Sequence, residues 1–320
     1  MSSRYFDASP PHMKLLSTSC LAGLVFLALV TLDSCKKDES TTTPPATSSG
    51  PRLILKFKFD STQVRLDAFG NPSVIPAGHA AQCPIFNTMS AHYVEFAHDM
   101  FTALGAGAVV YHAPETNAGG ATAIDFSQSV HVGDGAAFLN IPLSQLDTGV
   151  YDWLRVSLAY QNYNIGFRYT DTVFGLGALD LHGTVASFIG YNTYITSFQV
   201  HDQTVVVNDD KLQGFWAFEV IDPLVPIAAV TGQAPPGATT VVNPLFASSP
   251  IPAGSCVATG QFSTPLHITG HESSDVVVVV SLSTNKSFEW TDSAGDGIFE
   301  PAAGDTVVDM GIRGLIPIVQ

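Results

Sequence analysis

The chain has 320 residues, with 13 Lys and Arg against 28 Asp and Glu and a formal net charge of −15. This acidity argues against nucleic acid or an anionic lipid surface as a partner, because both attract a basic face. The chain contains 27 Gly, 20 Pro and 20 Phe, and runs of helix-favouring residues are scarce, which together are typical of an all-β protein.

The N-terminal segment has the pattern of an export signal. Lys14 is followed by an apolar run from Leu15 to Thr31, which is short for a membrane span and fits a signal peptide over residues 1–34, with Met13 as the expected start. Leu32-Asp33-Ser34-Cys35 closes the run and resembles a bacterial lipobox, apart from Asp33, where a small or aliphatic residue is preferred. The resemblance implies that Cys35 is acylated and becomes the mature N-terminus.

The residues after the cysteine carry a second resemblance. Lys36-Lys37-Asp38-Glu39 is similar to the surface-export signal of Bacteroidota lipoproteins. It implies an outer-membrane protein held in the lipid through the acylated Cys35 and exposed at the cell surface, with the periplasmic face as the alternative. Residues 35–50 are rich in Ser, Thr and Pro and are expected to form a disordered tether.

A folded β body is expected over residues 51–320. Leu53, Leu55, Phe57 and Phe59 alternate with mostly polar residues, which predicts a half-buried strand. The run from Val276 to Val280 is apolar on both faces and predicts a central strand covered on both sides. Further short strands are expected at 91–97, 108–112, 136–141, 153–160, 164–169, 184–189, 194–200, 204–207, 214–220, 266–268 and 287–290.

The clearest fold signal is the spacing Leu-x-x-Gly-x-Tyr from Leu146 to Tyr151. It resembles the tyrosine corner of Greek-key sandwiches, and implies that the Tyr151 hydroxyl bonds to the backbone a few residues upstream. The sequence therefore predicts an all-β, Greek-key β-sandwich of Ig-like or jelly-roll type. A Pro- and Gly-rich stretch near 233–240 leaves open a boundary before a small C-terminal β subdomain.

Two cysteines remain after the signal and the lipid site are set aside. Cys83 and Cys256 are expected to form a disulfide in an oxidising compartment, with two separate buried thiols as the alternative.

A first candidate metal site lies near the C-terminus. The segment from Asp292 to Glu300 resembles the first nine positions of a calcium loop. It departs from that pattern at Ala294 and Ala303, where further ligands belong. The expected ligands are Asp292, Asp296, the backbone carbonyl of Ile298, and Glu300. The alternative is an acidic, glycine-rich hairpin that binds no ion.

A second candidate metal site is a group of histidines. If residues 91–98 form a strand, His92 and His98 share a face, and a neighbouring strand from Val109 would bring His112 within reach. Glu115 follows close by in the sequence. Imidazole and carboxylate groups suit zinc or copper, so these histidines are candidate transition-metal ligands.

The sequence contains no GxSxG, HExxH, P-loop or GxGxxG motif. We therefore expect a lipid-anchored, non-catalytic binding or structural module of the cell envelope, with a glycan or protein partner at the surface. The alternatives are a copper- or zinc-binding envelope protein and a glycan-acting enzyme with dispersed carboxylates. The sequence also contains several aromatic residues that could form a sugar-stacking platform, with burial in the core as the alternative. They are Trp153, Tyr160, Tyr163, Tyr191, Tyr194, Trp216 and Trp290.

Overall fold

A computed structural model describes residues 50–171, 175–222, 229–234, 252 and 254–320. The predicted signal segment, Cys35, the tether up to residue 49 and most of the 233–240 boundary lie outside these residues. Thr47–Gln320 forms one compact unit by its internal contacts. Among the described residues, no helix has the length and apolar character needed to cross a membrane.

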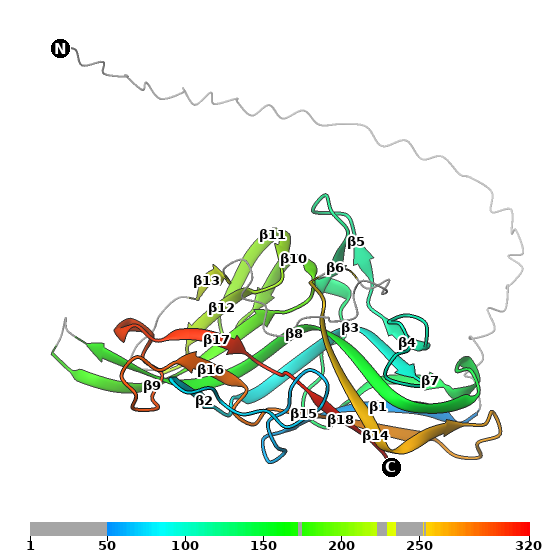
Figure 1. Cartoon of the computed structure of the whole chain (residues 1–320). Coiled ribbons are helices and arrows are strands. Elements are labelled where there is room, and N and C mark those ends of the chain that lie inside the picture. The colour runs from blue at the N-terminus through cyan, green and yellow to red at the C-terminus, as the bar shows by residue number, and fades with distance from the viewer. Residues whose placement is uncertain (1–49, 172–174, 223–228, 235–251, 253) are drawn as a thin grey trace, which may run out of the picture. The chain divides into compact units, whose positions relative to one another are not determined.

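The described chain is an all-β, sandwich-type fold, which confirms the predicted fold class (Figure 1). Its helical elements are short 3-10 turns, such as η1 (Phe126–Gln128), η2 (Leu143–Gln145) and η4 (Pro301–Ala303). The strands are β1 (Arg52–Asp60), β2 (His79–Gln82), β3 (Ile85–Ala97), β4 (Ala108–His112), β5 (Glu115–Thr116), β6 (Ala123–Asp125), β7 (Ala137–Pro142), β8 (Gly149–Asp171), β9 (Gly177–Phe188), β10 (Asn192–Gln199), β11 (Thr204–Leu212), β12 (Phe215–Val220), β13 (Val230–Gln233), β14 (Cys256–Ile268), β15 (Val276–Ser283), β16 (Phe288–Thr291), β17 (Thr306–Met310) and β18 (Leu315–Val319).

The largest sheet is organised around β8, a strand of 23 residues. Its strand order is β13-β12-β9-β8-β3-β4, and β14 also pairs with β8. The N-terminal half of β8 pairs with β14, and the C-terminal half pairs with β9. Figure 1 shows β8 in green beside β3 in cyan, its partner on the other side.

A four-stranded sheet, in the order β18-β15-β1-β7, contributes the second face of the main core. Leu53, Leu55 and Phe57 of β1 are fully buried in this core, as their alternation predicts. Val278 and Val280 of β15 join them, and β15 lies between β1 and β18 as expected for a central strand. Strands from both sheets therefore fill one apolar layer.

The described C-terminal strands pair with strands from the beginning and the middle of the chain. β15 pairs in parallel with β1, β16 pairs with β2, and β14 pairs with β8. Each of these pairings joins the end of the chain to its beginning or middle, so the described residues form one interlocked body.

The tyrosine corner is present as predicted. Tyr151 is buried at the start of β8, and its hydroxyl donates a hydrogen bond to the carbonyl of Asp147 at 2.9 Å. This bond ties the connection after η2 to the sheet.

The predicted disulfide between Cys83 and Cys256 is wrong, since both residues are free cysteines. Cys83 is exposed in the turn between β2 and β3, where the Lys286 amide donates to its sulfur at 3.2 Å. Cys256 is buried in β14 opposite Leu158, and burial raises the pKa of its thiol. The strand pairings, not a covalent bridge, join the two halves of the body.

Candidate metal centre

Two of the predicted histidines meet across the β3–β4 pair. β4 runs antiparallel to β3, with His112 opposite Tyr93, so His92 is the next residue along the facing strand. The chain then turns through Ala113, whose amide donates to the His92 carbonyl at 2.7 Å. This turn returns Glu115, the first residue of β5, to the two imidazoles.

Three ligand atoms converge at this point. Nε2 of His92 lies 2.9 Å from Oε1 of Glu115 and 3.2 Å from Nε2 of His112. Nε2 of His112 lies 3.4 Å from the same Glu115 oxygen. The Tyr191 hydroxyl donates to that oxygen at 3.1 Å. Two imidazoles and one carboxylate thus face a common point, which is the ligand set of many zinc sites that keep a position open.

The protonation states suit a metal ion. Burial lowers the pKa of His92, and the nearby His112 lowers it further, although the Glu115 carboxylate partly opposes this. Burial alone would raise the pKa of Glu115, but hydrogen bonds from His92 and Tyr191 bring it below its ordinary value. At neutral pH His92 is therefore neutral and Glu115 ionised, the charge states that a metal site needs, and a bound ion would take the place of the His92 proton that Glu115 now accepts.

The site is closed on one side and open on the other. The His92 side chain is 2% exposed, whereas His112 is 51% and Glu115 is 28% exposed. An ion can enter from the His112 side without unfolding β3. The buried Nδ1 of His92 has no hydrogen-bond partner among the described residues. It therefore lacks the outer acceptor that usually orients a metal-binding imidazole.

His98, the third predicted histidine ligand, does not join this group. β3 ends at Ala97, and His98 leaves the strand. Its Nδ1 lies 2.7 Å from the Val150 carbonyl, and its ring stacks on Tyr151 with centroids 4.8 Å apart. The third residue of the group is therefore Glu115, and not His98 as the strand pattern predicts.

A second group of residues that could hold a metal ion consists of His201, Asp202 and Glu219, whose ligand atoms lie within 4.8 Å of one another. Here the carboxylate of Glu219 is buried and accepts the amides of His201 at 2.9 Å and Gln203 at 3.0 Å. The amide of Asp202 donates to both of its oxygens at 3.1 Å. These bonds fix the turn between β10 and β11, so we interpret Glu219 as a structural anchor.

The predicted calcium loop connects the antiparallel strands β16 and β17. The two oxygens of Asp292 accept the amides of Gly295 at 2.7 Å and Gly297 at 2.8 Å. Asp296 accepts the amide of Ile298 at 3.0 Å, and Asp305 accepts that of Glu300 at 2.8 Å. These carboxylates do not form one of the ligand groups found among the described residues. The contacts favour the hairpin alternative, and calcium binding stays a prediction.

Three of the seven aromatic residues considered for sugar stacking, Tyr160, Tyr163 and Trp290, are buried in core clusters. Trp290 and Tyr163 are buried together between β8 and β16. Tyr191 lies over the metal candidate, a role that no spacing in the sequence indicates because β3, β5 and the turn after β9 meet only in the fold.

Comparison of the chain with protein-family models, with curated proteins and with solved structures gave no match. The functional conclusion therefore rests on the site.

Proposed function

We propose that the protein is a lipid-anchored protein of the cell envelope that binds one zinc or copper ion at His92, His112 and Glu115. The observation that carries the proposal is the convergence of three ligand atoms from β3, β4 and β5 within 4.8 Å of one another. This convergence moves the metal-binding alternative ahead of a module with an unspecified ligand.

Each residue has a distinct part in the proposed site. His92 supplies a neutral nitrogen from the buried side, and Glu115 supplies the negative charge that offsets the charge of the ion. His112 completes the site from the exposed side. Water or a ligand would take the fourth position, as in other three-residue zinc sites.

Metal titration of the full-length chain tests this proposal. The chain is purified in detergent, stripped with chelator, and titrated with zinc and with copper(II) while stoichiometry is measured by elemental analysis. We expect one ion per chain and a loss of affinity of about 100-fold or more in His112→Ala, because a direct ligand matters at least as much as its outer partners.

His98→Ala is the matched control, since His98 follows β3 directly and lies outside the group. It should bind the ion as tightly as the unaltered chain. Equal loss in the His98 and His112 variants, or the absence of stoichiometric binding, would contradict the proposal.

The proposed anchor has its own test. Its support is the apolar run that ends at Cys35 and the short charged segment after it. Cells that express the chain are fed labelled fatty acid, and Cys35→Ser should remove the label and release the protein from membranes. Cys20→Ser is the control, because the apolar run follows Cys20 instead of preceding it.

A further inference from the structure

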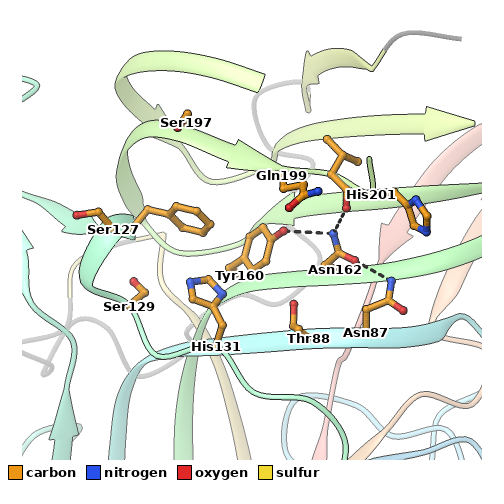
Figure 2. Close-up of a pocket in the computed structure, with 12 residues that line it drawn as sticks. Asn87, Thr88, Ser127, Ser129, His131, Tyr160, Asn162, Ser197, Gln199 and His201 are labelled. Carbon is orange, nitrogen blue, oxygen red and sulfur yellow. Dashed lines mark hydrogen bonds between the residues drawn. The ribbon is translucent and has the colours of Figure 1, made fainter. Parts of the chain in front are cut away.

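A second site lies beside a small four-stranded sheet. This sheet has the order β11-β10-β6-β5, and a pocket of about 450 Å³ is lined by residues of β10, η1, β3 and β8 (Figure 2). The volume is that of a pocket for a small molecule. Asn87, Ser197 and Gln199 are exposed around it, so it opens to solvent.

The pocket has no fixed charge. None of its lining residues is Asp, Glu, Lys or Arg, although the chain as a whole is strongly acidic. Burial lowers the pKa of His131, so this ring is neutral at pH 7. The nearest carboxylates, Asp125 and Asp202, contact the lining residues Ser127 and His201, so an anionic ligand would be repelled, whereas an uncharged ligand loses no ionic hydration on entry.

The floor of the pocket is a fixed amide network. Nδ2 of Asn162 donates to the Val200 carbonyl at 2.8 Å, and its second hydrogen bond reaches the Tyr160 hydroxyl at 3.3 Å. Nδ2 of Asn87 donates to Oδ1 of Asn162 at 2.8 Å. These bonds, drawn in Figure 2, hold the amides in one orientation before any ligand arrives.

Other polar groups around the network are free to bind. Figure 2 shows Gln199 and Thr88 on opposite sides of the Tyr160–Asn162 pair. Thr88, Ser197 and Gln199 have no side-chain hydrogen bond within the described part of the chain. Two hydroxyls and one amide therefore offer donors and acceptors of both kinds to a ligand.

Aromatic rings form the remaining wall. The rings of Phe126 and His131 are 4.8 Å apart, and each meets Tyr160 at 5.1 and 5.2 Å respectively. Phe126 also packs on Phe188 at 5.1 Å. The rings are thus held edge to face and present a rigid apolar surface next to the amides.

We propose that this pocket binds a neutral carbohydrate. A sugar ring has hydroxyl groups on its rim and apolar C–H groups on its faces, which match the free amide and hydroxyl groups and the aromatic wall.

The site is separate from the metal candidate. Glu115 belongs to β5, at the far edge of the small sheet from β10 and β11. No residue that lines the pocket is one of the three proposed metal ligands. Carbohydrate binding therefore does not depend on the proposed metal function.

The test uses the full-length chain in detergent and a panel of neutral tetrasaccharides of glucose, mannose, xylose and galactose. Saturation-transfer NMR detects binding and calorimetry measures affinity, with tetragalacturonate as the charged probe. We expect at least one neutral tetrasaccharide to bind and tetragalacturonate not to bind. Gln199→Ala and Ser197→Ala should each weaken binding about three- to tenfold, the effect of one hydrogen bond.

Matched controls are available on neighbouring exposed residues. Gln203→Ala is the control for Gln199→Ala, and Thr196→Ala is the control for Ser197→Ala. Both control residues are exposed and lie outside the pocket, so saccharide affinity should be unchanged. His112→Ala should also leave saccharide binding unchanged, which separates this result from the metal proposal. Binding of no neutral tetrasaccharide at millimolar concentration, preference for tetragalacturonate, or equal losses in pocket and control variants would overturn the proposal.

Discussion

Two regions of this protein carry residues that suit metal ions, and their carboxylates are used in opposite ways. In the β16–β17 connection, both oxygens of Asp292 and both of Asp305 accept backbone amides. At the His92 group, the Glu115 oxygen faces two imidazole nitrogens and a tyrosine hydroxyl, and no backbone amide of the described residues donates to it.

The difference shows what a list of ligand types leaves out. A carboxylate that already accepts backbone amides is tied to the loop that supplies them, and an ion has to compete with those hydrogen bonds. A carboxylate held among side-chain nitrogens can exchange those partners for an ion without breaking the backbone structure. The first arrangement stabilises a hairpin, and the second is a candidate binding site.

The largest expected effect is the stabilisation that a bound ion gives. At zinc concentrations about 100 times the dissociation constant, the ion should raise the free energy of unfolding by about 2.7 kcal/mol. The double variant His112→Ala/Glu115→Gln should lose this gain in thermal melts, whereas Asp292→Asn should keep it. If calcium stabilised the unaltered chain and Asp292→Asn removed that effect, the β16–β17 connection would be an ion-binding site and not only a structural hairpin.

A second prediction concerns the hairpin itself. Asp305 is buried, and Asp305→Ala leaves the amides of Ser293 and Glu300 without their acceptor, which should cost about 1–3 kcal/mol in chemical unfolding. Asp296→Ala, at an exposed position with one such contact, should cost about 0.5 kcal/mol or less. Equal costs would show that the carboxylates do not hold the loop.

The third prediction uses acid. The pKa of His92 is lowered below 6.5 in the fold, so below pH 6.5 the unfolded chain takes up a proton that the folded chain refuses. The free energy of unfolding should therefore decrease as the pH falls below 6.5, by at most about 1.4 kcal/mol per pH unit for this residue. Urea unfolding between pH 7 and 5 should show a shallower decrease in His92→Gln, and an unchanged slope would contradict the assignment.

The smallest expected effect is that of Tyr191→Phe. The variant keeps the ring and removes only the hydroxyl that donates to Glu115 at 3.1 Å. Zinc affinity should fall about three- to tenfold with unchanged stoichiometry, because the carboxylate loses one orienting bond. Tyr194→Phe is the control, and a similar loss there would remove Tyr191 from the site.

Much of the fold follows from local sequence pattern. Alternating Leu and Phe residues predict β1, the valine run predicts β15, and the spacing before Tyr151 predicts the corner bond. Each of these signals lies within about ten residues of chain.

The site depends on longer-range features, and the sequence predicts it only in part. Strand alternation correctly suggests that His92 and His112 approach each other, but it extends β3 to His98, one residue too far. Cys83 lies in the exposed turn between β2 and β3, whereas Cys256 is buried in β14 against β8, and no spacing in the sequence reveals this separation. The amides of the proposed carbohydrate pocket come from strands far apart in the chain for the same reason.

The parallel pairing of β1 with β15 affects the order in which the molecule can fold. Leu53, in the first described strand, has its partner at Val276, close to the end of the chain. The main core cannot close until these two segments, more than 200 residues apart, have met, and such long-range closure is slow. The pairing of β15 with β1, which completes the core, is therefore among the last steps of folding.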